Sequence, residues 1–133
     1  LASFIIQLKN IFQYEILWCF INITSTMEDL RTLNYLVTPF SINLFDKILT
    51  NNHNLEILNH LIWLLSHLVS ESIDMRNIIF ASNLYGKIIN SIQEQILNKE
   101  LMKNYCWFFA NLAKGKPAPS LLQVIYNYKI III

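Results

Sequence analysis

Apolar residues recur along the chain at helical spacing, and short polar or proline-containing stretches interrupt them. Ile42, Phe45, Ile48 and Leu49, for example, fall on one side of a helix. The pattern predicts helices over residues 2–9, 12–24, 28–37, 41–49, 55–69, 74–80, 84–96 and 99–114, and the start of another at 121–128. No alternating strand pattern competes with these assignments, so the expected fold class is all-α.

Three residues predict where helices stop or turn. Pro39 ends the segment before it, because a residue that precedes proline avoids helical geometry. A tight interhelical turn is predicted at Ser82 and Asn83, because asparagine is the best non-glycine residue for a positive backbone angle. Gly115, followed closely by Pro117, predicts the end of the helix at 99–114.

The three tryptophans of the chain mark an internal repeat. Trp18, Trp63 and Trp107 are spaced 45 and 44 residues apart, within the period of about 40 to 47 residues found in armadillo and HEAT units. Each is followed four residues later by a polar side chain, which is Asn22, His67 or Asn111. Residues four apart lie one above the other on a helix, so each indole shares a face with its polar partner.

Each unit consists of a short, a middle and a long helix, which is typical of armadillo rather than two-helix HEAT repeats. We therefore expect an armadillo-repeat, right-handed superhelical solenoid of about three repeats, in which each repeat mainly contacts its neighbours. The chain is predicted to be a single segment, residues 1–133, with a partial repeat at 1–25, repeats at 26–70 and 71–115, and the start of the next at 116–133.

Side chains that flank each tryptophan on its helix predict a peptide-binding groove. At about 100° per residue, three stripes form, consisting of Glu15, Trp18, Asn22 and Thr26, of His60, Trp63, His67 and Glu71, and of Asn104, Trp107 and Asn111. Parallel helices about 8 to 10 Å apart place these stripes side by side. An extended peptide could lie across them and insert side chains between the indoles.

Composition and charge exclude several other functions. The net charge is +1 and no basic stripe is visible, which argues against binding nucleic acid by neutralising phosphates. Charged residues interrupt every apolar window long enough to span a membrane. No glycine-rich phosphate loop and no nucleophile with a matching base is present, so we expect neither an enzyme nor a bound cofactor.

The histidines and cysteines do not predict a metal site. His53, His60 and His67 are seven residues apart, which on a helix is about 10.5 Å and too far for a shared ion. Cys19 and Cys106 each adjoin a tryptophan and are expected to be buried free thiols, which indicates a reducing compartment.

Three segments carry a resemblance to a known family. They are residues 13–25, 63–71 and 104–119, the last with the sequence NYCWFFANLAKGKPAP. Their order and spacing resemble the second, third and fourth armadillo repeats of importin-α, which form its major signal-binding site. Importin-α is the adaptor that carries proteins with a nuclear localisation signal into the nucleus, and it shuttles between cytoplasm and nucleus.

The resemblance implies roles for eight residues and the class of their ligand. The tryptophans Trp18, Trp63 and Trp107 would enclose the aliphatic stems of signal lysines, Asn22, Asn104 and Asn111 would contact the peptide, and Glu71 would pair with the key lysine. His67 replaces an expected asparagine, so we expect it to bind peptide backbone less well and, when protonated near pH 6, to repel lysine. The implied partners are lysine-rich nuclear localisation signals of cargo proteins. Importin-β would bind only through a segment that this chain does not contain.

Two alternatives remain open. The chain could be an armadillo scaffold that holds protein partners and has lost signal binding, in which case neighbouring side chains should cover the tryptophans. It could also be a non-functional truncated product, since it starts at Leu1 and ends in four isoleucines at 130–133. Because of this start and this apolar end, we expect the chain to be either a fragment of a longer solenoid or the product of a truncated gene.

Overall fold

The computed structural model describes residues 2–26, 33, 35, 37–51, 53–95, 97–114 and 117–120. Within these residues every regular element is a helix, and the fold is all-α. The helices are α1 (Ala2–Thr26), α3 (Pro39–Asn51), α4 (Leu55–Glu71), α5 (Ile73–Ala81), α6 (Asn83–Gln95) and α7 (Lys99–Ala113).

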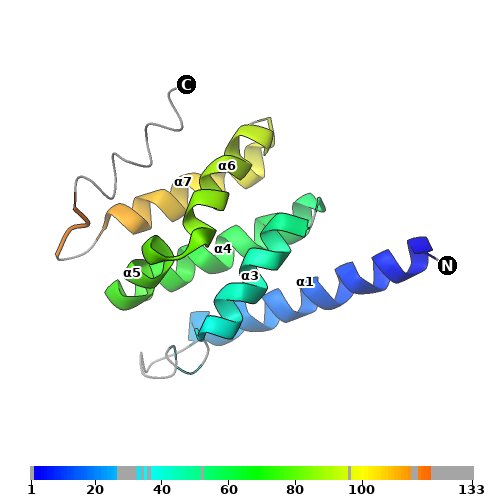
Figure 1. Cartoon of the computed structure of the whole chain (residues 1–133), viewed down its shortest axis with the longest axis horizontal. Coiled ribbons are helices and arrows are strands. Elements are labelled where there is room, and N and C mark those ends of the chain that lie inside the picture. The colour runs from blue at the N-terminus through cyan, green and yellow to red at the C-terminus, as the bar shows by residue number, and fades with distance from the viewer. Residues whose placement is uncertain are drawn as a thin grey trace.

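The helices form two layers (Figure 1). The long helices α1, α4 and α7 lie side by side in one row and run in the same direction, with α4 in the middle. The helices α3 and α6 pack against each other in the second layer, and the short helix α5 connects α4 to α6. The three tryptophan-bearing helices are therefore neighbours in space although 44 or 45 residues separate equivalent positions.

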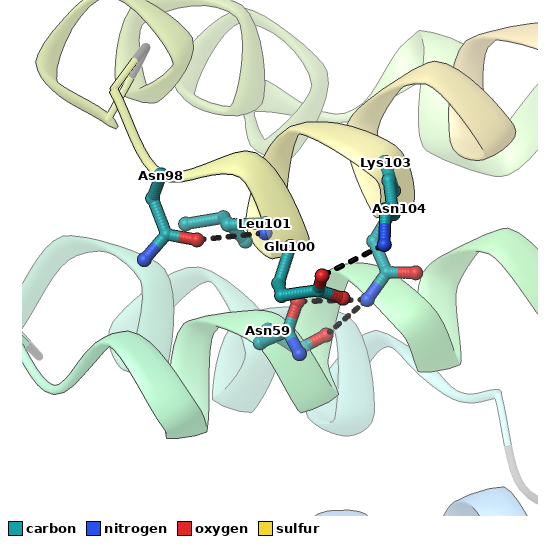
Figure 2. Close-up of polar contacts among 6 residues, drawn as sticks. All are labelled: Asn59, Asn98, Glu100, Leu101, Lys103 and Asn104. Carbon is teal, nitrogen blue, oxygen red and sulfur yellow. Dashed lines mark hydrogen bonds and ion pairs between the residues drawn. The ribbon is translucent and has the colours of Figure 1, made fainter.

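Polar side chains fix where three of these helices begin. Asn54 precedes α4, and its Oδ1 accepts hydrogen bonds from the backbone N–H groups of Glu56 (2.9 Å) and the following residue. Ser72 precedes α5 in the same way, and Asn98 precedes α7 with its Oδ1 2.9 Å from the N–H of Leu101 (Figure 2). These bonds satisfy N–H groups that have no partner inside the helix.

The hydrophobic core is centred on α4. This helix is covered by α1 on one side, by α7 on the other and by α3 and α5 elsewhere. Five of its apolar side chains have no exposed surface, namely Leu61, Ile62, Leu64, Leu65 and Leu68. Burying each such side chain stabilises the fold by about 1.5–3 kcal/mol, so α4 holds the two neighbouring long helices together.

Two polar contacts join other parts of the fold. Lys87 on α6 donates to Asp46 on α3 at 2.7 Å, which links the two helices of the second layer. Arg76 on α5 is buried, and its Nη1 donates to the carbonyl of Lys114 at the end of α7 (3.2 Å). A guanidinium is favourable there because the C-terminal end of a helix carries partial negative charge.

Three sequence predictions need correction. The segments predicted at 2–9 and 12–24 form one continuous helix, because Asn10 and Ile11 between them do not break a helix as proline or glycine would. Asn83 is the first residue of α6, and the turn is made by Ser82 in an extended conformation (φ −89°). Cys19 and Cys106 are exposed, since they lie on the outer sides of α1 and α7.

Several predictions lie outside the described residues. They are most of the helix at 28–37, the helix start at 121–128, the stop at Gly115 and the terminal isoleucines. Within the described residues, no helix combines the length and apolarity needed to span a membrane.

Candidate functional site

Six aromatic side chains form a continuous row across the three long helices, which we call the aromatic row. It consists of Tyr14 and Trp18 on α1, His60, Trp63 and His67 on α4, and Trp107 on α7. Successive ring centroids are 4.6 to 6.2 Å apart, within the range at which aromatic pairs attract each other. The structure thus brings the three predicted tryptophans and His67 together on one surface.

The tryptophans Trp18 and Trp63 are in direct contact. Their ring centroids are 6.2 Å apart and the ring planes are inclined by 55°. A methylene chain between two rings needs carbon contacts of about 3.5–4.0 Å on each side, hence a separation of about 7–8 Å. The space between these two indoles is therefore closed to a lysine stem, although Trp18 keeps 39% of its surface exposed.

The imidazole of His67 occupies the space between Trp63 and Trp107. Its centroid is 5.9 Å from that of Trp63 and 5.0 Å from that of Trp107, and it meets Trp107 edge to face at 85°. The imidazole thus links the indole of α7 to that of α4.

Burial among these rings lowers the pKa of His67 below its ordinary value of 6.5, because the charged imidazolium loses contact with water. The negative charge of Glu71 opposes this shift and raises the pKa. The first effect is the larger, so burial favours the neutral imidazole.

Asn104 joins α7 to α4 (Figure 2). Its Nδ2 donates to Oδ1 of Asn59 at 2.8 Å and lies 3.4 Å from the carbonyl oxygen of the same residue. In this arrangement the donor that could contact a peptide is used between helices. Its predicted role in peptide binding stays a prediction.

Asn111 is likewise engaged with α4, whereas Asn22 is exposed. The side chain of Asn111 is buried, and its Nδ2 donates to the carbonyl oxygen of Ser66 at 3.1 Å. Asn22 holds the equivalent position on α1 and is open to solvent. Of the three predicted asparagines, Asn22 is the one whose amide is best placed to meet a peptide.

Glu71 is exposed at the end of α4 and accepts a weak hydrogen bond from Ser70 (3.4 Å). It lines a cavity of ≈ 150 Å³ together with Asn111, Arg76 and Lys114. The glutamate that was predicted to pair with a lysine thus borders the same cavity as the buried Asn111.

Sequence reasoning missed three residues of this surface, namely Tyr14, Asn59 and Ser66. Asn59 and Ser66 lie 45 residues before Asn104 and Asn111, within one residue of the spacing of 44 between Trp63 and Trp107, and this spacing could have identified them as neighbours. Tyr14 gave no such signal. Among the described residues, no cluster of histidine, cysteine or acidic side chains could hold a metal ion.

Comparisons with known proteins give one distant relative. No family model matches the chain, and no solved structure matches it. The importin subunit alpha-1b of Oryza sativa subsp. japonica is 24% identical over 112 residues, which cover 84% of this chain and 20% of that protein. The chain thus spans about a fifth of the length of this curated relative. The match indicates a distant relationship to the importin-α type of armadillo protein.

Proposed function

We propose that the chain is a segment of an importin-α-like armadillo solenoid whose aromatic row binds lysine-rich peptides of the nuclear localisation signal class. The observation that carries this proposal is the alignment of Trp18, Trp63 and Trp107 on three parallel neighbouring helices. An ammonium group over an indole face contributes about 0.5–2 kcal/mol, and several such contacts along one peptide add up to useful affinity. The distant similarity to an importin-α subunit supports the same function.

The close contacts of Trp18 with Trp63, and of His67 with its two neighbouring indoles, determine how such a peptide would bind. A first lysine would lie over the exposed part of Trp18, near the amide of Asn22. A second lysine would have to displace the imidazole of His67 from between Trp63 and Trp107. Binding therefore costs the free energy of two aromatic contacts, each about 0.5–1.5 kcal/mol, before the lysine gains its own.

The test is fluorescence anisotropy with a labelled lysine-rich signal peptide and a matched peptide in which the central lysine is alanine. We expect lysine-dependent binding that Trp63→Ala reduces by about tenfold or more, because Trp63 contacts rings on both sides. Phe40→Ala is the matched control, since Phe40 is 78% exposed on α3 in the other layer. Circular dichroism verifies that each variant is folded.

His67→Asn sharpens the test. Removing the imidazole opens the space between Trp63 and Trp107, so we expect affinity for the lysine peptide to rise about five- to tenfold. The affinity for the alanine-substituted peptide should rise little. Equal affinities of the original chain and this variant would show that the slot is not used.

A second candidate is an armadillo scaffold that holds protein partners without binding signal peptides. The contact between Trp18 and Trp63 and the burial of Asn111 favour it, because both remove groups that a signal peptide would need. A folded chain that binds neither peptide, also after His67→Asn, would refute the first proposal and favour the scaffold.

A further inference from the structure

A cavity of ≈ 490 Å³ lies where the start of α3, the end of α5 and the start of α6 meet (Figure 1). Its walls come from residues 37–84, in the middle of the chain, so neither end of the chain contributes to it. Most of the wall is aliphatic, and the apolar side chains that form it are Val37, Pro39, Ile42, Ile78, Ala81 and Leu84. A cavity of this volume with mainly apolar walls is typical of sites that hold a small molecule.

Asp46 is the charged residue of this wall, and its carboxylate is only partly satisfied. Oδ2 accepts a hydrogen bond from Nζ of Lys87 at 2.7 Å, whereas Oδ1 is buried and has no hydrogen-bond partner. Among the described residues, no other buried side-chain nitrogen or oxygen atom lacks a partner. A buried acceptor without a donor costs free energy, and a donor placed in the cavity would recover it.

We propose that the cavity binds a neutral, largely apolar small molecule that donates one N–H or O–H hydrogen bond to the carboxylate of Asp46. The torsion that turns an aspartate carboxylate is soft, so one oxygen can face the ligand while the other keeps its bond to Lys87. A neutral donor fits better than an ammonium group. A second cation would lie near the charge of Lys87 and would lose its hydration between apolar side chains.

The test uses indole and benzofuran as matched probes, because both have the same fused-ring shape and only indole carries an N–H donor. Each probe is titrated into the full chain, and backbone amide chemical shifts are followed by NMR. We expect saturable shifts at the amides of residues that line the cavity. Indole should bind about tenfold or more tightly than benzofuran, since benzofuran cannot form the hydrogen bond to a charged acceptor.

Two pairs of variants connect binding to the cavity and to Asp46. Ala81→Phe fills the cavity and should abolish these shifts, whereas Ala110→Phe places the same side chain on α7 and should leave them unchanged. Both alanines are exposed, and circular dichroism verifies that the variants stay folded. Asp46→Ala and Lys87→Ala both remove the ion pair, but only Asp46→Ala should abolish the preference for indole.

Three outcomes would overturn the proposal. Equal affinities for indole and benzofuran, or a preference for indole that persists in Asp46→Ala, would show that Asp46 does not accept the hydrogen bond. Shifts confined to the aromatic row, or shifts that survive Ala81→Phe, would place the ligand outside the cavity. The absence of shifts with either probe up to its solubility limit would show that the cavity does not bind ligands of this class.

Discussion

The two interfaces of the long-helix row occupy the same place in the repeat but use different chemistry. Between α4 and α7, Asn104 and Asn111 donate hydrogen bonds to Asn59 and Ser66. Between α1 and α4, rings contribute the cross-helix contacts, with Tyr14 against His60 and the indole of Trp18 against that of Trp63. The interface between α4 and α7 thus adds amide hydrogen bonds to the ring contact of His67 with Trp107, whereas ring contacts join α1 to α4.

The difference arises from which residue follows each tryptophan. An asparagine on α7 turns its amide to the carbonyl oxygen of Ser66 on the preceding helix. The equivalent residue on α4 is His67, whose ring instead lies between two indoles. On α1 it is Asn22, which stays exposed because no described helix lies on the side of α1 that faces away from α4. An asparagine four residues after the tryptophan therefore joins two repeats only where the long helix of the preceding repeat packs beside it.

The largest expected effect contrasts Phe108 with its equivalent on α1, Cys19. Phe108→Ala leaves a cavity in a fully buried site and should lower the free energy of unfolding by about 3–5 kcal/mol. Cys19→Ala, measured at dilution, should change it by less than about 0.5 kcal/mol, because Cys19 is exposed. Urea unfolding followed by circular dichroism measures both, and Phe108→Leu replaces the alanine variant if that variant does not fold. Similar losses at the two positions would contradict the exposure of Cys19.

A smaller effect separates Asn111 from Asn22. Asn111→Ala removes a buried donor from Ser66 and should cost about 1–2 kcal/mol of stability. Asn22→Ala should fall within about 0.5 kcal/mol of the original chain, since its amide is exposed. Equal effects of the two substitutions, again by urea unfolding, would contradict the assignment of Asn111 to a structural contact.

A double-mutant cycle tests the hydrogen bond between Asn104 and Asn59 (Figure 2). Each alanine substitution removes one partner of the 2.8 Å hydrogen bond, and the pair should show a coupling energy of about 0.5–1.5 kcal/mol. The pair Lys103 and Glu100 is the matched control. Both of its side chains are largely exposed, so its coupling should be no more than a few tenths of a kcal/mol. If the coupling energy between Asn104 and Asn59 is as small as that of the control pair, their hydrogen bond contributes little, and the amide of Asn104 is available to a peptide.

Local signals in the sequence predicted much of the helical frame. The bounds of α4, α5, α6 and α7 lie within two residues of the predicted ones, because polar residues such as Asn54 and Ser72 precede helices with clear apolar periodicity. The break near Asn10 was wrong, since helix propensity there is modest but no residue forbids a helix.

The state of the site could not be predicted in the same way. Helical spacing placed the indoles on one face of their helices, but the width of each slot depends on ring rotamers and on contacts between helices. The role of His67 as a weak peptide ligand stays a prediction, and the sequence did not predict that its ring contacts both Trp63 and Trp107. Burial of Asn111 depends on Ser66, which is 45 residues away and becomes a neighbour only through stacking.

The smallest effect concerns pH, and it tests the histidine that interrupts the asparagine pattern. The pKa of His67 is lowered in the folded chain, so protonation costs more in the folded than in the unfolded state. Stability is therefore full above the ordinary pKa of 6.5 and falls as the pH drops from there through the lowered pKa, by less than the one-proton limit of about 1.4 kcal/mol per pH unit. His67→Asn should remove this component between pH 8 and 5. Glu71→Gln should enlarge it, because Glu71 raises the pKa of His67 and its removal lowers that pKa further. Urea midpoints across this range measure all three chains. A shallower pH dependence in Glu71→Gln than in the original chain would mean that Glu71 does not act on the imidazole. The pKa of this ring, which contacts Trp63 and Trp107, would then depend on burial alone.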